Sequence, residues 1–401
     1  MKLLQVNSSA DIGSTGRIVK DLGNFVTRSE GESYIAYGRY GKKRGANTIK
    51  IGTKISQLHH LIQTRLFDTH GLHSRRATED LLDEIRETNP DIIHLHNLHG
   101  YYLNIETLFI FLKKYGRPVV WTLHDCWPFT GHCCYFERIK CDKWKTICGS
   151  CELSFLYPET KVFDNSEKNF LIKRNAFLDV PNLTIVTVSE WLATQVKQSF
   201  LKDYPLQTIY NGIDADIFKP KNQIESKEIL GLSDFKIILG VANEWSDGKG
   251  LNMFFEISKH LDSNSKVVLI GLNKKQMKTL PKGIIGYNRT KDLNELVNFY
   301  NAADVFVSPS VAETFGLVVA EALSCGTPCI VNNSSALPEL VDESVGYVVS
   351  NDYREYIAAI KHILSVPKLN FLIATTARAE QFELSNHLKS YYNLYKKILN
   401  S

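Results

Sequence analysis

The chain has 401 residues and a formal net charge of +4, a length that suits two domains and a charge too small to indicate nucleic-acid binding. Hydrophobic residues make up 44% of it and charged residues 22%, which excludes a disordered or fibrous protein. The sequence turns polar after Val6, and no apolar run approaches the roughly 18 residues that cross a bilayer. We therefore expect a globular, cytoplasmic protein that does not bind nucleic acid.

The first half of the chain predicts alternating strands and helices. A buried strand over residues 2–7 is followed by a loop that carries Gly16 and Arg17, and then by an apolar-periodic helix. Such a loop is weak evidence for a ligand site, because turns need glycine whatever their function. A second strand is predicted over residues 33–38.

A basic segment, residues 39–54, follows that strand. Its cationic residues are Arg39, Lys42, Lys43, Arg44, Lys50 and Lys54. A solvated face is the commoner explanation of such a run, and peripheral contact with an anionic membrane surface is the alternative.

Two further strands, residues 91–97 and 118–125, carry histidines toward their carboxyl ends, where open parallel sheets bind ligands. We place His96 and His124, which precedes Asp125, near a ligand site, and we expect His94 to be a core residue. A metal site at these histidines lacks a supporting pattern of acidic residues.

Six of the eight cysteines fall within residues 126–151. Cys148 and Cys151 have the paired spacing of a tetrahedral thiolate site, and Cys141 with either Cys133 or Cys134 would complete four ligands. Because disulfides are disfavoured in the cytoplasm, the pattern predicts a structural zinc ion. An iron–sulfur cluster and plain reduced thiols remain the alternatives.

The second half repeats the alternation of strands and helices, which predicts a second Rossmann-like domain. Its predicted strands cover residues 236–242, 266–271 and 283–287, and its predicted helices cover residues 250–260 and 293–302. Lys249 precedes the first of these helices, and Asn288 follows the third strand.

Residues 304–340 predict a strand, a loop, a helix and another strand, with Glu313 in the loop and Glu321 in the helix. The amides of Gly316 and Leu317 would begin the helix, where its dipole favours a phosphate. Glu321 is placed to accept hydrogen bonds from a ribose diol. The pattern is typical of a sugar-nucleotide site, although two solvated carboxylates would give the same spacing.

The pair Glu313 and Glu321, with Phe315 and Gly316 after the first, resembles the signature of the retaining glycosyltransferases of family 4. The resemblance implies the GT-B fold, an α/β architecture of two Rossmann-like domains that face a cleft. It divides the chain into an acceptor-side domain over residues 1–205, a donor-nucleotide domain over 206–384, and a helix over 385–401 that packs back on the first domain.

The same resemblance assigns roles to individual residues. Glu313, His124 and Lys249 are the catalytic candidates. Donor contacts are implied for Gly16, Arg17, Lys249, Asn288, Glu313, Phe315, Gly316, Leu317 and Glu321. The family's arginine before the lysine is replaced here by Gly248, and its glycine-rich turn by Ser334, Ser335 and Ala336.

The implied reaction moves a hexose from a nucleoside-diphosphate-sugar to a hydroxyl of a glycan or lipid-linked acceptor, without a catalytic metal. The run from His124 to Cys151 resembles a subset of the family that makes bacterial surface polysaccharides, which implies peripheral contact with the inner face of the membrane. A sugar-nucleotide epimerase and a non-catalytic nucleotide-sugar-binding subunit are the alternatives. The sequence argues against a nicotinamide dehydrogenase, because neither glycine loop has the G-x-G-x-x-G form with its distal acid.

Overall fold

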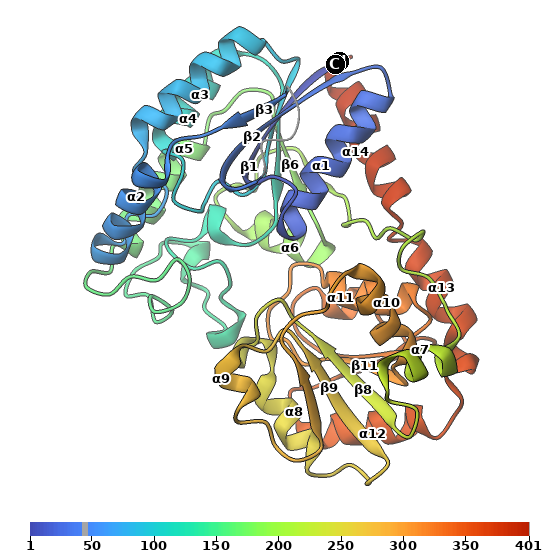
Figure 1. Cartoon of the computed structure of the whole chain (residues 1–401). Helices are drawn as coiled ribbons and strands as arrows, with labels where there is room; N and C mark the ends of the chain where they lie inside the picture. Colours follow the sequence, from blue (N-terminus) through green and yellow to red (C-terminus); the bar gives the residue numbers. More distant parts are fainter. Residues whose placement is uncertain (42–46, 401) are drawn as a thin grey trace. The chain divides into compact units, whose positions relative to one another are not determined.

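The structure, a computed structural model, describes residues 1–41 and 47–400, and Figure 1 shows the arrangement of its elements. The chain divides into two compact units, Met1–Tyr210 with Leu388–Ser401, and Asn211–His387. Each unit holds one parallel sheet flanked by helices, which confirms the predicted class of two Rossmann-like α/β domains. Lys42, Lys43 and Arg44 of the basic segment lie outside the described residues.

The first unit contains a seven-stranded sheet in the order β3-β2-β1-β4-β5-β6-β7. Its strands are β1 (Lys2–Ser9), β2 (Glu32–Tyr40), β3 (Thr48–Lys50), β4 (Ile92–Leu95), β5 (Val119–Leu123), β6 (Leu183–Thr187) and β7 (Leu206–Thr208). Its helices are α1 (Gly13–Arg28), α2 (Lys54–Phe67), α3 (Arg75–Thr88), α4 (Ile105–Tyr115), α5 (Ser166–Phe177), α6 (Glu190–Gln198) and most of α14 (Leu384–Leu399).

Helix α14 belongs to the core of the first unit although it ends the chain, and Figure 1 shows it beside α1. Tyr391 and Tyr395 are completely buried with residues of β1, β4 and β5. The Tyr395 hydroxyl lies 2.6 Å from Nδ1 of His94, and the other ring nitrogen of His94 lies 2.8 Å from Thr122 Oγ1. His94 is therefore the satisfied core histidine that the sequence predicts.

The second unit contains a six-stranded sheet in the order β10-β9-β8-β11-β12-β13. Its strands are β8 (Lys236–Val241), β9 (Ser265–Ile270), β10 (Ile284–Tyr287), β11 (Val305–Ser308), β12 (Cys329–Asn332) and β13 (Gly346–Val349). Its helices are α7 (Gln223–Leu230), α8 (Leu251–Ser258), α9 (Lys274–Met277), α10 (Leu293–Ala302), α11 (Leu317–Ser324), α12 (Tyr353–Leu364) and α13 (Leu372–Glu380).

The order of the strands reverses once in each sheet, and this fixes where a ligand can bind. The reversal lies between β1 and β4 in the first unit and between β8 and β11 in the second. At such a switch point the loops after the two strands leave on opposite faces and open a crevice at the carboxyl ends. The loops that carry Lys249 and Glu313 follow β8 and β11, so they border the switch point of the second unit.

The sequence reasoning did not foresee α2 and α3, which follow the basic segment. In α2 the buried positions His60 and Thr64 are polar, and its apolar residues include five exposed ones. An amphipathic helix is normally recognised by an apolar stripe that faces the core. In α2 the apolar residues face outward instead, so the helix was not recognised from the sequence.

Among the described residues, no single helix is long and apolar enough to cross a membrane. One pair, Tyr353–Leu364 with Lys368–Glu380, passes the length and composition test only jointly, and it is bent by 100° at its break.

Candidate functional site

Lys249 and Glu313 form an ion pair at the switch point of the second unit. Lys249 ends a short turn, Asp247–Lys249, between β8 and α8, and Glu313 lies in the loop between β11 and α11. Lys249 Nζ lies 2.5 Å from Glu313 Oε1, and the two side chains are 37% and 17% exposed. An ion pair this accessible adds little to the stability of the fold. Both of its charges are instead available to a ligand.

The backbones of the two loops are tied together. The Val311 amide donates to the carbonyl oxygen of Gly248 over 3.0 Å. Gly250 has φ +78°, and a Cβ there would lie 2.5 Å from the ring of Pro309. The missing side chain at Gly250 thus permits the close approach, and the position of Lys249 relative to Glu313 is set by the main chain.

A third loop, after β12, holds Glu313 from the other side. The Glu313 amide donates to Ser335 Oγ over 2.8 Å, and the Ala336 amide donates to the Glu313 carbonyl oxygen over 3.1 Å. Ser335 has φ +52°, a left-handed conformation that glycine adopts at lower cost. Ser334 and Ser335, noted in the sequence only as a departure from a glycine-rich turn, therefore position a site residue.

Helix α11 begins at this site with Gly316 as its N-cap residue, at φ +102°. A Cβ at Gly316 would lie 2.8 Å from a methyl carbon of Leu337. The first amides of a helix lack partners within it and carry its positive partial charge. Gly316 and Leu317 thus supply anion-binding amides at the end of the loop that carries Glu313.

Glu321 lies within α11, where the residue is 9% exposed. Glu321 Oε2 accepts a hydrogen bond of 2.7 Å from the Tyr300 hydroxyl of α10. Burial, together with the charge of Glu321, holds the pKa of Tyr300 well above its ordinary value, so Tyr300 remains a donor. The sequence reasoning missed Tyr300, since the partner comes from a separate helix.

Two other predicted donor residues have structural contacts in the second unit. Phe315 is 2% exposed, and its ring packs edge-on against Phe382 at 5.4 Å. The Asn288 side-chain amide donates to the Leu272 carbonyl oxygen over 2.6 Å and ties the ends of β10 and β9 together. If Phe315 contacts the donor, it therefore does so through its backbone and not through its ring.

In the first unit, a chain of hydrogen bonds links three strands at the carboxyl end of the sheet. His124 Nε2 lies 3.1 Å from His96 Nδ1, and His96 Nε2 lies 3.3 Å from Gln5 Oε1. The Gln5 amide in turn donates to the Val19 carbonyl oxygen of α1 over 2.8 Å. Since Gln5 Oε1 can only accept, His96 Nε2 donates to it, and Gln5 thereby orients the pair of histidines.

Asp125 accepts hydrogen bonds on both carboxylate oxygens. His99 Nε2 lies 2.7 Å from Oδ2, and the Trp127 amide donates to Oδ1 over 2.9 Å. Burial alone would raise the pKa of Asp125, but His99 and the Trp127 amide outweigh it and hold the pKa below its ordinary value. We call His96, His99, His124 and Asp125 the histidine group.

The predicted loop residues of the same unit lie at the start of α1. Gly16 is buried, and a Cβ there would lie 3.0 Å from Ser9 Oγ, whereas Arg17 is exposed. The Gly16 carbonyl oxygen accepts from the Asp11 amide over 3.1 Å. The loop after β1 is thus tightly closed on the helix, with Arg17 directed to solvent.

Potential metal ligands gather in two places in the first unit. Ligand atoms of His99, Asp125 and Cys134 all lie within 4.8 Å of one another. The predicted ligands Cys133, Cys141, Cys148 and Cys151 line one small cavity in the loop before α5.

Each of the two units matches a glycosyltransferase family model. The family model described as Glycosyltransferase Family 4 matches residues 15–217, and the model described as Glycosyl transferases group 1 matches residues 236–366. A protein of Escherichia coli K12 named as a colanic acid biosynthesis glycosyl transferase, WcaC, is 26% identical over 99% of this chain and 100% of its own length. An Escherichia coli UDP-Gal:alpha-D-GlcNAc-diphosphoundecaprenol alpha-1,3-galactosyltransferase is 28% identical over 44% of this chain and 50% of its own length.

Solved structures agree on the fold. Sucrose-phosphate synthase from Thermosynechococcus elongatus superposes with a TM-score of 0.75 at 16% identity, over 99% of both chains. Anabaena HepE in complex with UDP superposes with a TM-score of 0.67 at 15% identity, over 99% of this chain and 100% of that chain. The chain therefore belongs to glycosyltransferase family 4 and is a glycosyltransferase with the GT-B fold.

Proposed function

We propose that this enzyme transfers a hexose, with retention at the anomeric carbon, from a nucleoside-diphosphate-sugar to a hydroxyl of a glycan or lipid-linked oligosaccharide in surface polysaccharide synthesis. The observation that carries the proposal is the Lys249–Glu313 pair, 2.5 Å apart, in loops adjoining the start of α11. The name of WcaC, which refers to colanic acid biosynthesis, and the diphosphoundecaprenol acceptor in the name of the galactosyltransferase support the acceptor class.

The chemistry turns on negative charge that develops on the leaving diphosphate. Lys249 supplies a full positive charge, and the amides of Gly316 and Leu317 supply partial ones, so the departing group is stabilised without a catalytic metal. Because the main chain fixes these donors, they need little reorganisation during the reaction. Glu321 and Tyr300 hold the ribose, and Asn288 marks the base end of the site.

Glu313 acts on the sugar. In the structure it pairs with Lys249, and an incoming diphosphate would compete for that lysine. The carboxylate is then left to bind sugar hydroxyls or to stabilise positive character on the ring. In the first unit, His124, oriented through His96, contributes to positioning the sugar or the acceptor hydroxyl, and Gly16 and Arg17 contribute donor contacts.

A thermal-shift panel tests the donor assignment. UDP, GDP, ADP, dTDP and their common hexose conjugates are compared on the wild type, Glu321→Ala and the exposed control Glu343→Ala. We expect one nucleotide to stabilise the wild type and the control, and Glu321→Ala to lose that shift. Folded wild-type protein that responds to none of them would overturn the proposal.

Product analysis tests the reaction. We expect transfer only when an acceptor is present, and an anomeric configuration in the product equal to that of the donor by NMR. An altered sugar nucleotide from donor alone would identify an epimerase instead, and nucleotide binding without turnover on any acceptor would identify a binding subunit.

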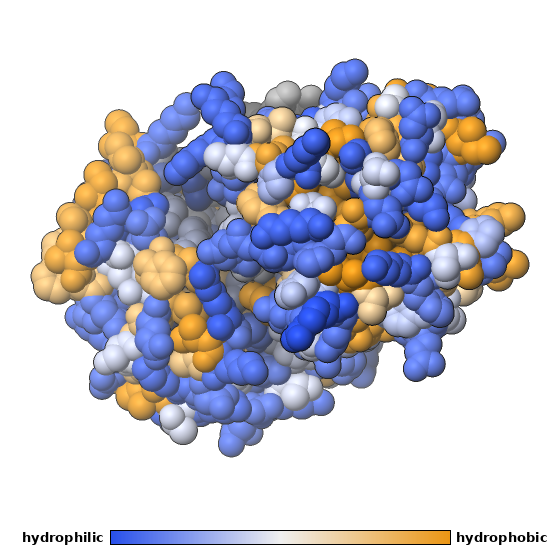
Figure 2. Space-filling model, turned by 90° about the horizontal axis from the view of Figure 1, so that it is seen from below, coloured by the Kyte–Doolittle hydropathy of each residue, from blue (hydrophilic) through white to orange (hydrophobic). Residues whose placement is uncertain are grey.

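The exposed face of α2 supports peripheral contact with the membrane that holds a lipid-linked acceptor. Ile55 is 81% exposed, Leu58 56% and Ile62 46%, and their spacing of three and four residues places them on one side of the helix. The face continues through Leu66 and Phe67 to Val162 and Phe163, and the rings of Phe67 and Phe163 stack at 5.7 Å. Figure 2 shows hydrophobic side chains gathered at its left edge, the side where Figure 1 draws α2.

Exposed cations flank this apolar face, which suits an anionic bilayer surface. They include Lys54 at the start of α2 and Lys161 beside Val162. In vesicle sedimentation we expect binding that rises with the share of anionic lipid and is lost in Leu58→Glu. The control Ile224→Glu, at a residue that is 69% exposed in the second unit, should bind like the wild type. Concentration-dependent dimers without vesicle binding would assign the face to a second copy of the chain instead.

A further inference from the structure

The connection between β5 and α5 contains an apolar nucleus but little regular structure. Within residues 124–165 the structure assigns three short 3-10 turns, Trp127–Phe129, Glu137–Ile139 and Lys143–Lys145. Trp144 is 1% exposed and stacks on Phe136 at 4.8 Å. A loop of this length without helices or strands usually needs support from ligands or cross-links.

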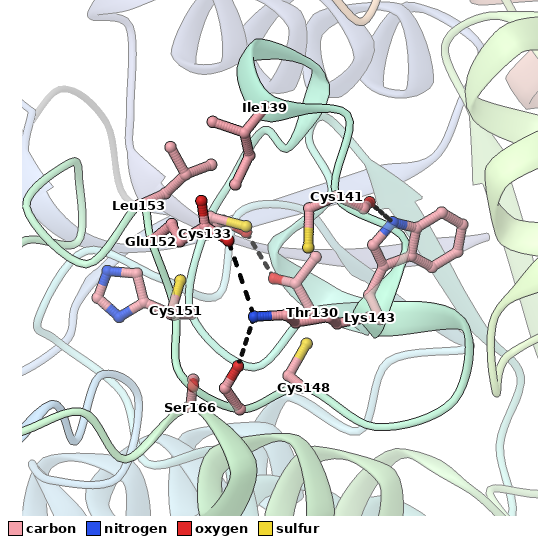
Figure 3. A pocket seen from close by; sticks show the side chains of 13 residues that line it. Thr130, Cys133, Ile139, Cys141, Lys143, Cys148, Cys151, Glu152, Leu153 and Ser166 are labelled. Carbon is pink, nitrogen blue, oxygen red and sulfur yellow. Dashed lines mark hydrogen bonds and ion pairs between the residues drawn. The ribbon is translucent and has the colours of Figure 1, made fainter.

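Four thiols converge inside this loop. Cys133, Cys141, Cys148 and Cys151 line a cavity of about 20 Å³, and Figure 3 shows their sulfur atoms directed into the space between them. All four are free thiols. The spacing predicted Cys133 with Cys134 as its alternative, and the lining of the cavity includes Cys133 and not Cys134.

The loop backbone around the cavity is hydrogen-bonded. The Gly131 amide donates to Cys148 Sγ over 3.2 Å, a contact of the kind that stabilises a metal-bound thiolate. A side chain at residue 131 would place its Cβ 2.0 Å from the carbonyl oxygen of Ser166, so glycine is needed for that contact. The indole of Trp144 donates to the Cys141 carbonyl oxygen over 2.9 Å, and the Cys151 amide donates to Asp164 Oδ2 over 2.6 Å.

We propose that Cys133, Cys141, Cys148 and Cys151 bind one structural Zn²⁺ as a tetrathiolate site. Zinc prefers four soft ligands in a tetrahedron, at a Zn–S distance of about 2.3 Å. Binding converts the thiols to thiolates, and their protons pass to solvent. The sulfur atoms then lie roughly 3.8 Å apart, which follows from the tetrahedral distance. Among the described residues the four do not form a group within 4.8 Å, so metal binding draws them closer.

The neighbouring group of His99, Asp125 and Cys134 is a weaker zinc site, although its atoms are closer together. Both ring nitrogens of His99 already have partners, the Asp125 carboxylate at 2.7 Å and the Tyr157 hydroxyl at 3.0 Å. Zinc there would displace one of these hydrogen bonds. In the four-cysteine cavity, zinc would replace the hydrogen bond between the Cys133 and Cys151 thiols, whose protons leave in any case when the thiolates form.

Elemental analysis of the full-length protein, purified without a metal-affinity tag, tests the proposal. We expect about one zinc per chain, the value for a structural site, in the wild type and in Cys134→Ala. Cys148→Ser and Cys151→Ser should each lose most of it. Replacement of zinc by Co²⁺ should give the intense absorption of tetrahedral cobalt thiolate in the wild type and in Cys134→Ala.

Other outcomes overturn the proposal without relying on variants that fail to fold. Folded wild type with less than about 0.2 zinc per chain, after expression in zinc-supplemented medium, excludes a structural site of ordinary affinity. Stoichiometric iron with sulfide would identify a cluster instead. Loss of zinc in Cys134→Ala would move the site to His99 and Asp125, and two disulfides in the native protein would leave no thiolates for a metal. None of these results depends on sugar transfer.

Discussion

The Lys249–Glu313 site of the second unit and the histidine group of the first unit both lie at the carboxyl ends of their sheets but are built differently. Main-chain hydrogen bonds between adjacent loops fix the former, whereas side chains from β1, from the ends of β4 and β5 and from the loops that follow set the latter. A site held by its backbone tolerates changes in its surroundings. A site held by side chains depends on every side chain in its hydrogen-bonded series.

The comparison predicts that the largest loss of turnover follows removal of the Lys249 charge from the site held by its main chain. Lys249→Ala should lower the turnover number of transfer by about 10²–10³-fold, because the cation that stabilises the leaving diphosphate is lost. Steady-state kinetics would measure this, with the exposed Lys282→Ala as the control for a lost surface charge. Near wild-type turnover in Lys249→Ala, with nucleotide still bound, would refute the role given to this residue.

A smaller loss is expected in the histidine group. His124→Ala should lower turnover by about 10²-fold, the low end of the range for a positioned acid–base side chain, while the thermal shift caused by the nucleotide stays unchanged. Gln5→Leu removes the carbonyl oxygen that orients His96, at 3.3 Å, together with the amide that donates to Val19, and should lower turnover less than His124→Ala. Equal losses in the two variants would contradict positioning through His96, and a lost nucleotide shift in His124→Ala would place this residue in donor binding.

The hydrogen bond between Tyr300 and Glu321 should have a smaller effect still. Tyr300→Phe removes one hydrogen bond to a charged group, worth about 1.5–3 kcal/mol, and only the part of it that depends on the orientation of Glu321 reaches the nucleotide. We expect nucleotide affinity, measured by calorimetry, to fall about threefold to tenfold with turnover at saturation unchanged. A fall in turnover with unchanged affinity would remove Glu321 from the ribose and place it at the chemical step.

The sequence predicted the second unit well because its signals are local. Strand β11, the loop with Glu313, helix α11 and strand β12 follow one another within residues 305–332, so spacing along the chain reports their geometry. Tyr300 and Ser335 were missed as partners, since their contacts depend on how α10 and the turn after β12 pack. A serine at φ +52° gives no sign in the sequence that its hydroxyl holds a neighbouring loop.

The first unit was predicted less completely, for physical reasons. His96 and Gln5 are 91 residues apart, and only the pairing of β1 with β4 brings them together. Helix α2 was missed because its apolar residues face outward. The cysteine spacing indicated the four thiols, with Cys134 as an alternative to Cys133, but only the folded loop shows that Cys133 and the other three line one cavity.

The last prediction concerns stability and not activity, at Glu137 in the cysteine-rich loop. Burial raises the pKa of Glu137 to about 7, and a hydrogen bond of 3.1 Å from the Phe136 amide opposes this only in part. The folded state therefore holds a proton that the unfolded chain releases near its ordinary pKa of 4.5. The stability from this group is complete below that value and is lost as the pH rises through 7.

Glutamine resembles the protonated acid at every pH, so Glu137→Gln should remove this pH dependence. By urea unfolding, we expect the free energy of unfolding of the variant to exceed that of the wild type by about 1–2 kcal/mol at pH 8 and to match it near pH 4.5, since partial solvent access reduces the full linkage energy. An equal difference at both pH values would mean that packing, and not ionisation, separates the two proteins. A pH-dependent difference would show that ionisation of the buried Glu137 destabilises the folded cysteine-rich loop. The main-chain hydrogen bonds around Lys249 involve no group that ionises, so they carry no such penalty.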